Sequence, residues 1–224
     1  MTAITAITAQ STVGVSAVYP LPPEAIVEQT RAVVDDIGVD AVKIGMVGSA
    51  EAVRAVGEAL DLVGDAPVVL DPVMVAESGA RLLDPDAEQA LRELVSRVTV
   101  VTPNLAEAAA LSGQEAAPAD LVRAVHALGS RIAVVTGGHR EVAADLFFDG
   151  DRLEELPGAR HPDGAAHGSG CTHSSALACG LARGMEPLEA ARMARQVAGE
   201  AVRDGFRDLG AGAGPVNALG VGRG

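Results

Sequence analysis

A glycine turn directly precedes a cysteine in the stretch AHGSGCTHSSALACG, residues 166–180. Gly168 and Gly170 permit backbone conformations and close approaches that other residues resist, and the apolar run behind them is typical of a helix. The first N–H groups of a helix have no intrahelical partner, so the turn Gly168-Ser169-Gly170 and the helix start predict an anion hole for a transferring phosphoryl group. Cys171 lies at the helix N-terminus, where the dipole favours a thiolate. The local alternative is a tight turn with a cysteine that packs as a small apolar residue.

Apolar runs alternate with helical patterns along the rest of the chain. The runs that predict buried strands are 40–45, 66–71, 98–102 and 131–136. The segments that predict helices are 23–38, 50–63, 84–97, 118–129, 171–183 and 187–206. This alternation is typical of a parallel sheet covered on both faces, in which ligands bind beyond the carboxyl ends of the strands. Polar and glycine residues collect there, in the segments 45–46, 71–74, 102–108 and 136–139.

Several finer features have local signals. Asp84 is the expected N-cap of one helix, with Pro85 at its first position, and Gly129 is expected to close another. Residues 141–156 predict a hairpin that turns at Asp149-Gly150. Because there is no internal repeat and no linker-like boundary, we expect residues 1–224 to form a single domain.

The net charge of −13 argues against a nucleic-acid or anionic-membrane partner, since both need a basic face. A helix terminus can still bind an anionic substrate locally. No apolar run is long enough to span a bilayer, and we expect a cytoplasmic protein. Cys171 and Cys179 lie about 12 Å apart if both are on one helix, whereas a disulfide needs Cα atoms within about 7 Å. We therefore expect two free thiols.

Seven segments carry a resemblance to a known family. They are ITAQSTVGVSAVYPLPPE (7–24), KIGMVGS (43–49), LDPVMVAESGARLL (70–83), TPNLAEAAALSG (102–113), VVTGGH (134–139), HGSGCT (167–172) and GAGPVNAL (212–219). In order and spacing they resemble the hydroxymethylpyrimidine/phosphomethylpyrimidine kinases of thiamine biosynthesis, which belong to the ribokinase-like superfamily. The resemblance implies a three-layer α/β/α sandwich with a mostly parallel central sheet. It also implies ATP and Mg²⁺ as cofactors, a small-molecule pyrimidine substrate and a homodimer.

The implied reaction is phosphorylation of the hydroxymethyl group of 4-amino-5-hydroxymethyl-2-methylpyrimidine and then of the resulting monophosphate. Cys171 stands where many ribokinase-like sugar kinases carry an aspartate as base for the substrate hydroxyl. The resemblance implies the same position for this thiol. Gln10 matches a pyrimidine-binding glutamine and Met46 matches the lining of the ring pocket. Their local alternatives are a strand-end glutamine that faces water and a core methionine.

The resemblance places a metal and nucleotide side on other segments. Asp71 and Glu107 match positions that organise Mg²⁺, which typically keeps several waters and few protein carboxylates. The residues implied on the nucleotide side are Asn104, Thr136, Gly137 and Gly138, and relatives often carry Lys at the threonine position. Locally, Asn104 and Glu107 also fit an N-cap and a solvated first-turn acid, and Asp71 fits a turn cap before Pro72.

No catalytic or ligand-binding role is assigned to the lysine or to the histidines. Lys43, the only lysine in the chain, is interpreted as a charge that reaches water from a strand end. The histidines form no metal-binding pattern: His139, His161, His167 and His173. His167 and His173 flank the glycine turn, and we expect them to cap it or to face solvent.

Relatives carry a glycine-rich strand-loop-helix before the position of Ile4. We therefore expect an N-terminally truncated sandwich that starts in the family's second strand, lacks a strand in the middle of its sheet and has low stability and weak activity. Two alternatives stay open: a pyridoxal or pyridoxine kinase of the same fold, and a non-catalytic fragment that binds a pyrimidine or a nucleotide. A dinucleotide-binding oxidoreductase is disfavoured because no G-x-G-x-x-G follows a first strand.

Overall fold

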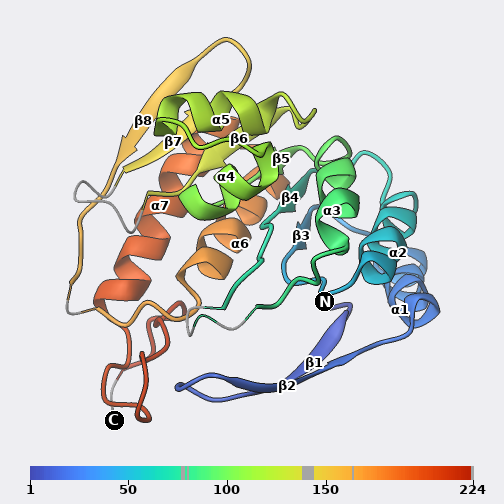
Figure 1. Ribbon diagram of the computed structural model, residues 1–224, viewed down its shortest axis with the longest axis horizontal. Helices are drawn as coiled ribbons and strands as arrows, with labels where there is room; N and C mark the ends of the chain where they lie inside the picture. Colours follow the sequence, from blue (N-terminus) through green and yellow to red (C-terminus); the bar gives the residue numbers. More distant parts are fainter. Residues whose placement is uncertain (77–78, 80, 138–143, 163, 223–224) are drawn as a thin grey trace.

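Two sheets and the helices around them make up the computed structural model, which describes residues 1–76, 79, 81–137, 144–162 and 164–222. The elements, in chain order, are β1 (Ala6–Gln10), β2 (Val15–Pro20), α1 (Pro23–Asp36), β3 (Val42–Ile44), α2 (Ala50–Leu60), β4 (Val68–Leu70), α3 (Ala87–Val95), β5 (Val100–Val101), α4 (Leu105–Ser112), α5 (Pro118–His126), β6 (Ile132–Val135), β7 (Ala144–Phe148), β8 (Leu153–Pro157), α6 (Ser169–Ala182) and α7 (Pro187–Arg203). Figure 1 shows their arrangement.

The central sheet has six strands in the order β3-β4-β5-β6-β7-β8. The pairs from β3 to β6 are parallel, and the two pairs that involve β7 are antiparallel. The predicted mostly parallel sheet and its four strands are confirmed, but Val42 and Lys43 of the edge strand β3 are half-buried rather than buried. The predicted hairpin is confirmed as β7 and β8, and its turn is held by the Asp149 side chain, which accepts from the amides of Asp151 and Arg152.

Alternating apolar side chains divide the core into two clusters, one on each face of the sheet. Leu70 and Val101 pack with residues of α1 to α5. Val69 and Val100, which point the other way, pack with α6 and α7. Because successive side chains of a strand face opposite sides, β-branched and leucine-rich strands buried on both faces produce three layers. Figure 1 shows α6 and α7 across the sheet from α4 and α5.

The predicted helices are present, but two starts are misplaced: α6 begins at Ser169 rather than at residue 171, and α3 begins late. Asp84 is not an N-cap, because α3 begins at Ala87 and follows Asp86. The Asp84 amide donates to the Gly48 carbonyl at 2.8 Å, which ties this residue to the loop after β3. The chain then makes a turn through Pro85 before the helix starts. The predicted N-cap therefore lies two residues before the observed one, Asp86.

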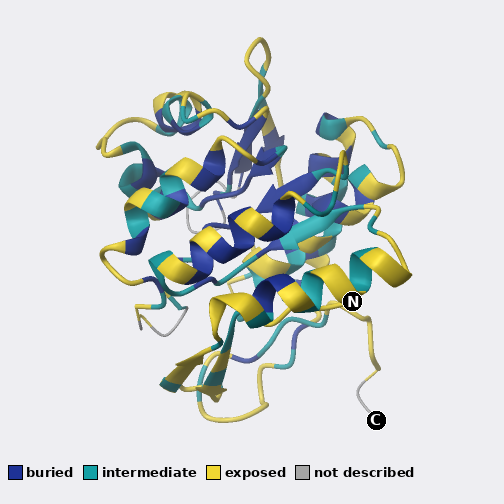
Figure 2. Ribbon diagram, turned by 90° about the vertical axis from the view of Figure 1, so that its right-hand side faces the viewer, coloured by how far each residue is buried: buried dark blue, intermediate teal, exposed yellow. Residues whose placement is uncertain are grey.

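The N-terminal segment forms a separate two-stranded sheet. β1 and β2 pair antiparallel, with Ile7 opposite Tyr19. The expectation of a gap in the middle of the central sheet is wrong, because β3 to β6 pair consecutively and β1 lies outside that sheet. Figure 2 shows most of this hairpin exposed. Within the described ranges, no helix combines the length and apolar character needed to cross a membrane.

Candidate active site

The first turn of α6 lies where the parallel strands end. Gly168 precedes the helix in a left-handed conformation, with φ at +88°, which glycine adopts readily. No side chain of the described residues caps this helix start. The first-turn amides, partly positive through the helix dipole, therefore border a space that suits an anion. Ser169 and Gly170 form this turn together with Cys171 at the third helical position.

Asp71 joins the end of β4 to that helix. Its side chain is buried, and the Ser174 hydroxyl donates to its Oδ2 at 3.1 Å. Burial raises the pKa of Asp71 above its ordinary value, although Lys43 and Ser174 both act to lower it. The local alternative, a turn cap before Pro72, is not what this side chain does, because its contacts go to Lys43 and Ser174.

Lys43 is part of this cluster, and the interpretation that it reaches water from a strand end is wrong. Its Nζ lies 3.6 Å from Asp71 Oδ2, and its side chain is 20% exposed. A Cβ at Gly45 would stand 2.7 Å from that nitrogen, so a larger residue there would displace the ammonium group. No local pattern indicates this placement, because the partner of Lys43 follows another strand.

Cys171 is a free thiol at the surface of the cluster, and Cys179 is also free, as predicted. Burial raises the pKa of the Cys171 thiol. Lys43 opposes this shift, whereas the negative charges of Asp71 and Glu107 add to it. The expectation that the helix start favours the thiolate stays a prediction, since burial acts against the charged form and Lys43 acts for it.

Asn104 and Glu107 form a capping box at the start of α4. The Asn104 side chain accepts from the Glu107 amide at 2.9 Å, and Glu107 Oε2 accepts from the Asn104 amide at 2.9 Å. The local N-cap reading is thus confirmed, but Glu107 is buried rather than solvated. Burial raises its pKa to about 7, and the nearby charge of Asp71 contributes to that shift.

Two buried carboxylates, those of Asp71 and Glu107, suit a magnesium site with few protein ligands better than a site built from protein ligands alone. Each is a hard oxygen donor whose charged form is disfavoured by burial, so a cation between them would be stabilising. No cluster of three or more His, Cys, Asp or Glu side chains with metal-binding geometry exists in the described part of the chain. A metal held by Asp71 and Glu107 would therefore take its other ligands from water and phosphate oxygens.

The loop after β6 lies beside the loop after β5. Thr136 and Asn104 form an isolated parallel bridge, and the Thr136 amide donates to the Pro103 carbonyl at 2.8 Å. The Gly137 amide donates to Asp145 Oδ1 at 3.0 Å. The expected nucleotide-side residues Asn104, Thr136 and Gly137 are thus brought together, while Gly138 lies outside the described residues.

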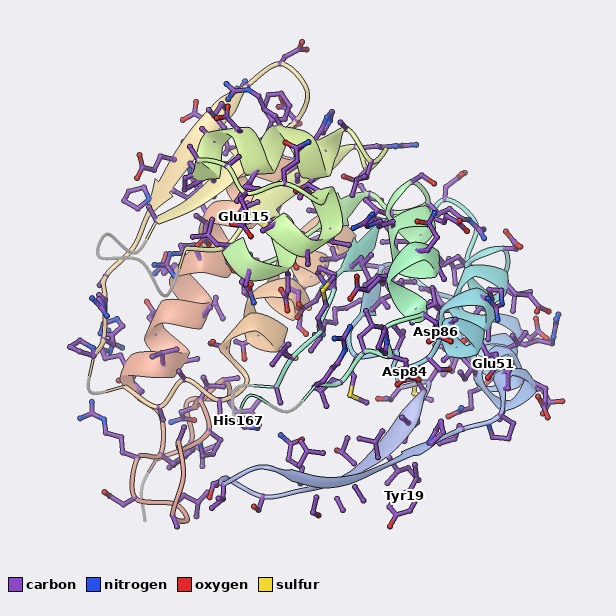
Figure 3. The ribbon with its side chains drawn as sticks, viewed as in Figure 1. Tyr19, Glu51, Asp84, Asp86, Glu115 and His167 are labelled. Carbon is purple, nitrogen blue, oxygen red and sulfur yellow. The ribbon has the colours of Figure 1, made fainter. Side chains whose placement is uncertain are left out.

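Gln10 and Met46 border the cluster from the hairpin side. The Gln10 amide nitrogen lies 3.3 Å from His167 Nε2, directly before the glycine turn. Figure 3 places His167 where the hairpin approaches the start of α6. Met46 follows Gly45, and its carbonyl accepts from the Thr5 hydroxyl at 2.8 Å. Gln10 is exposed and Met46 is half-buried.

Two buried polar residues were missed by the sequence analysis. His173, expected to cap or face solvent, is 3% exposed, and Asp145 on β7 is 1% exposed. His173 Nε2 lies 3.3 Å from Asp145 Oδ2. A histidine two positions after the cysteine could have drawn attention, but the aspartate that faces it gave no signal within an apolar strand.

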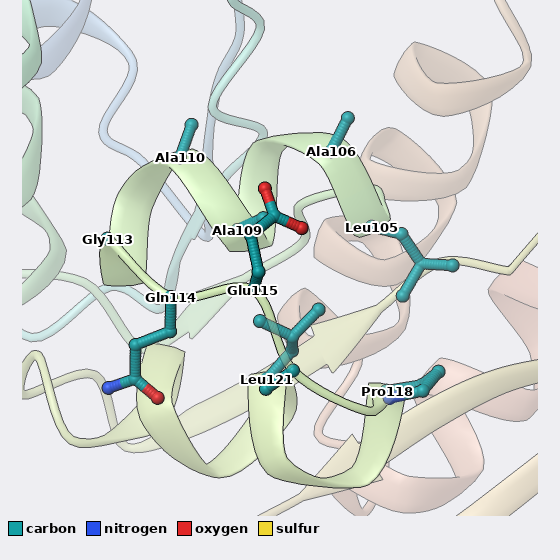
Figure 4. Close-up of a pocket in the computed structure, with 10 residues that line it drawn as sticks. Leu105, Ala106, Ala109, Ala110, Gly113, Gln114, Glu115, Pro118 and Leu121 are labelled. Atoms are coloured by element: carbon teal, nitrogen blue, oxygen red, sulfur yellow. The ribbon is translucent and has the colours of Figure 1, made fainter.

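A separate groove of about 660 Å³ runs between α4 and α5 (Figure 4). Its lining residues include Leu105, Pro118 and Leu121. None of the candidate residues described above lines it, and its walls are mostly alanine and leucine. The groove is therefore distinct from the cluster around Cys171.

Comparisons with known proteins agree with this arrangement. The phosphomethylpyrimidine kinase family profile matches residues 1–217. A hydroxymethylpyrimidine/phosphomethylpyrimidine kinase of Rhizobium meliloti is 46% identical over 96% of this chain and 84% of its own length. The ADP complex of Bacillus subtilis pyridoxal kinase has a TM-score of 0.87 at 34% identity and covers 97% of this chain and 85% of its own.

A second solved structure extends the comparison. Pyridoxal kinase of Staphylococcus aureus, in complex with AMP-PCP and pyridoxal, has a TM-score of 0.85 at 30% identity over 96% of this chain and 81% of its own. The profile spans nearly the whole chain, and the fold is that of ribokinase-like vitamin kinases. This protein, a phosphotransferase with its candidate site at the start of α6, therefore belongs to the phosphomethylpyrimidine kinase family.

Proposed function

We propose that this protein transfers the γ-phosphoryl group of ATP to the hydroxymethyl group of 4-amino-5-hydroxymethyl-2-methylpyrimidine, and then to the phosphate of the monophosphate formed. The observation that carries the proposal is the uncapped start of α6 with Cys171 beside Lys43 and Asp71. The relative from Rhizobium meliloti, named for this pyrimidine activity, supports the choice of substrate.

In the first step the substrate hydroxyl oxygen forms a bond to the γ-phosphorus while the bond from that phosphorus to the β–γ bridging oxygen breaks. ADP leaves with the bridging oxygen, and the hydroxyl proton passes to the Cys171 sulfur as thiolate. The amides at the α6 start, apart from that of Ser169, which donates to the Ala166 carbonyl, would stabilise charge on the transferring group. Lys43 stabilises the thiolate, since its ammonium group lowers the pKa of this thiol.

Asp71 and Glu107 would hold Mg²⁺, which neutralises phosphate charge when it is bound. The Thr136–Gly137 loop and Asn104 would contact the nucleotide, in keeping with the ADP and AMP-PCP in the two solved relatives. The Gln10 amide would donate and accept along the ring edge, and Met46 would pack on the ring. Cytoplasmic location fits this role, since ATP and reduced cysteines are found there.

The matched test compares two cysteines of the same helix. Cys171→Ala should lower turnover at least 100-fold, whereas Cys179→Ala, which removes an exposed thiol two turns further along α6, should leave it unchanged. Turnover is followed by mass spectrometry of the mono- and diphosphate, with ATP and Mg²⁺. Equal loss in both variants, or none in either, would refute the role of Cys171.

Pyridoxal phosphorylation is the second candidate, because the two solved relatives described above are pyridoxal kinases. The identity is higher to the pyrimidine kinase, 46% against 34%. We expect kcat/KM for the pyrimidine to exceed that for pyridoxal when both compete in one reaction. ATP binding without turnover of either ring would favour the non-catalytic alternative.

We also propose a homodimer that forms through the β1–β2 hairpin. Ile7 and Tyr19 face each other across the hairpin and are 57% and 60% exposed. Figure 3 shows Tyr19 pointing away from the body of the molecule. A two-stranded sheet is marginally stable by itself, and a second copy would cover this apolar pair.

A further inference from the structure

A buried histidine–aspartate pair behind the start of α6 has no part in the reaction proposed above. His173 and Asp145 are 3% and 1% exposed, and their Nε2 and Oδ2 atoms lie 3.3 Å apart. Arg195 of α7 approaches the same carboxylate, with its Nε 3.8 Å from Oδ1. The pair therefore connects α6 with β7 and α7 inside the core.

The second oxygen of Asp145 connects this pair to the loop after β6. Asp145 Oδ1 accepts from the Gly137 amide at 3.0 Å, and Gly137 follows Thr136 at the end of β6. Burial alone would raise the pKa of Asp145, but His173, Arg195 and the Gly137 amide hold the pKa of this carboxyl below its usual range. The carboxylate is therefore ionised. One oxygen accepts a hydrogen bond from the Gly137 amide, and the other faces His173 of α6.

Ser174, the residue after His173 in α6, makes a similar contact with a buried carboxylate on the other side of the site. The Ser174 hydroxyl donates to Asp71 at the end of β4, while His173 faces Asp145 on β7. Two consecutive residues of one helix thus contact buried carboxylates on two strands that β5 and β6 separate. These contacts fix the orientation of α6 relative to both sides of the sheet edge.

Packing alone does not require a polar pair at this place. Burial of polar groups costs free energy that hydrogen bonds must offset, and apolar side chains of similar volume are often as stable or more stable. The other side chains of α6 that face this core, Leu177 and Ala178, are apolar. What the pair provides and apolar residues would not is a hydrogen-bonded position for the Gly137 amide.

We propose that His173 and Asp145 are positioning residues that hold the Thr136–Gly137 loop in register with the start of α6. Resting on the proposed function, the inference assigns them to the nucleotide side: they align the donor phosphate with the anion hole, and they leave the pyrimidine side unaffected. Neither residue touches a reacting atom. Their effect reaches ATP only through the loop.

The test compares His173→Phe, His173→Gln and Asp145→Asn with the unchanged protein. We expect His173→Phe and Asp145→Asn to raise the KM for ATP or lower kcat about 10-fold, because misplacement of a reacting group by about 1 Å costs that much or more. The KM for the pyrimidine should stay within about twofold. His173→Gln, whose amide could donate to Asp145 Oδ2, should recover part of the loss.

A matched control uses another histidine that packs near β7. His126 of α5 stacks edge-on against Phe148 with ring centroids 5.0 Å apart, outside the site. His126→Phe should leave kcat and both KM values unchanged. The double variant His173→Phe/Asp145→Asn should lose no more than the larger single loss, because the two residues act as one unit.

Calorimetric binding of AMP-PCP separates this inference from the proposed function. Weaker binding in the folded His173 and Asp145 variants, with no turnover in any protein, would support the inference and refute the function. Variants that change only the melting temperature, with wild-type KM values and wild-type AMP-PCP affinity, would overturn it. Equal loss of pyrimidine and ATP affinity would also overturn it, as would a wild-type protein that binds no nucleotide.

Discussion

At the scale of single residues, the site depends on a balance between one cation and several buried acids. Lys43 is the positive side chain that lowers the pKa of both Asp71 and Cys171, while burial raises both. Glu107 adds a further negative charge near the thiol. Removal of the Lys43 ammonium group should therefore change the pKa values of Asp71 and Cys171 more than it changes the structure of the site.

Lys43→Met tests this balance, because methionine retains an unbranched stem but not the charge. We expect kcat/KM at pH 7 to fall 10- to 100-fold and the rising limb of the pH profile to move to higher pH, since the thiolate loses its stabilising neighbour. Thiolate absorbance near 240 nm, measured in a Cys179→Ser background, reports the Cys171 pKa directly. An unshifted profile would contradict the role given to this lysine.

Glu107 predicts how stability depends on pH in protein freed of divalent metal. Its pKa is about 7 in the folded protein against an ordinary value of 4.5, so the folded state holds a proton that the unfolded state has lost between these pH values. Stability should therefore fall as pH rises from about 4.5 to 7, by up to about 3 kcal/mol.

The measurement is the melting temperature from pH 4.5 to 8 in the presence of a chelator. Glu107→Gln keeps an oxygen for the Asn104 amide and should remove most of that slope, so it should be more stable than the unchanged protein at pH 8. A slope of the same size in both proteins would assign the pH dependence to other groups.

At the scale of elements, the hairpin that carries Gln10 is attached at its tip to the glycine-rich C-terminal loop. The Gly212 amide donates to the Thr12 hydroxyl at 3.3 Å. A Cβ at Gly212 would overlap the Thr12 carbonyl oxygen, so an alanine there must push the tip away. The same loop pairs with the chain before the glycine turn, where His167 bridges Pro215.

Gly212→Ala should therefore weaken pyrimidine binding through the hairpin. We expect the KM for the pyrimidine to rise several-fold and the KM for ATP to change little, because the described contacts of Thr136 and Gly137 go to residues 103, 104 and 145 and not to the hairpin. Gly222→Ala is the control, since nothing lies within 4 Å of a Cβ at that position. Steady-state kinetics with each substrate varied in turn would check this. Equal KM changes for both substrates would contradict a local effect.

The elements differ in how far their sequence predicted them. Strands β3 to β6 were predictable because short β-branched runs buried on both faces have little alternative. The start of α3 was misplaced because the Asp84 amide bonds to Gly48, a contact that local patterns do not contain. The contacts of Lys43 with Asp71 and of His173 with Asp145 were missed for the same reason. Each joins residues 28 positions apart in the chain, so only the fold brings them together.

At the scale of the whole molecule, the exposed hairpin predicts association. Ile7→Asp with Tyr19→Asp places charge on the proposed contact and should convert a dimer to a monomer in light-scattering measurements. Ile37→Asp, at an isoleucine that is 61% exposed after α1, should leave the mass unchanged. A monomer before any substitution, or a dimer that survives the hairpin charges, would refute this interface.

The single lysine has a practical consequence for handling the protein. Apart from the α-amino group at Met1, the chain offers one primary amine, and that amine lies 3.6 Å from Asp71 in the candidate site. Coupling to small activated-ester dyes at high pH would therefore label the exposed Met1 amine and, in addition, the centre of the chemistry. The rate at which Lys43 is labelled, and the decrease of that rate when nucleotide is bound, would measure how much of the protein has an occupied site.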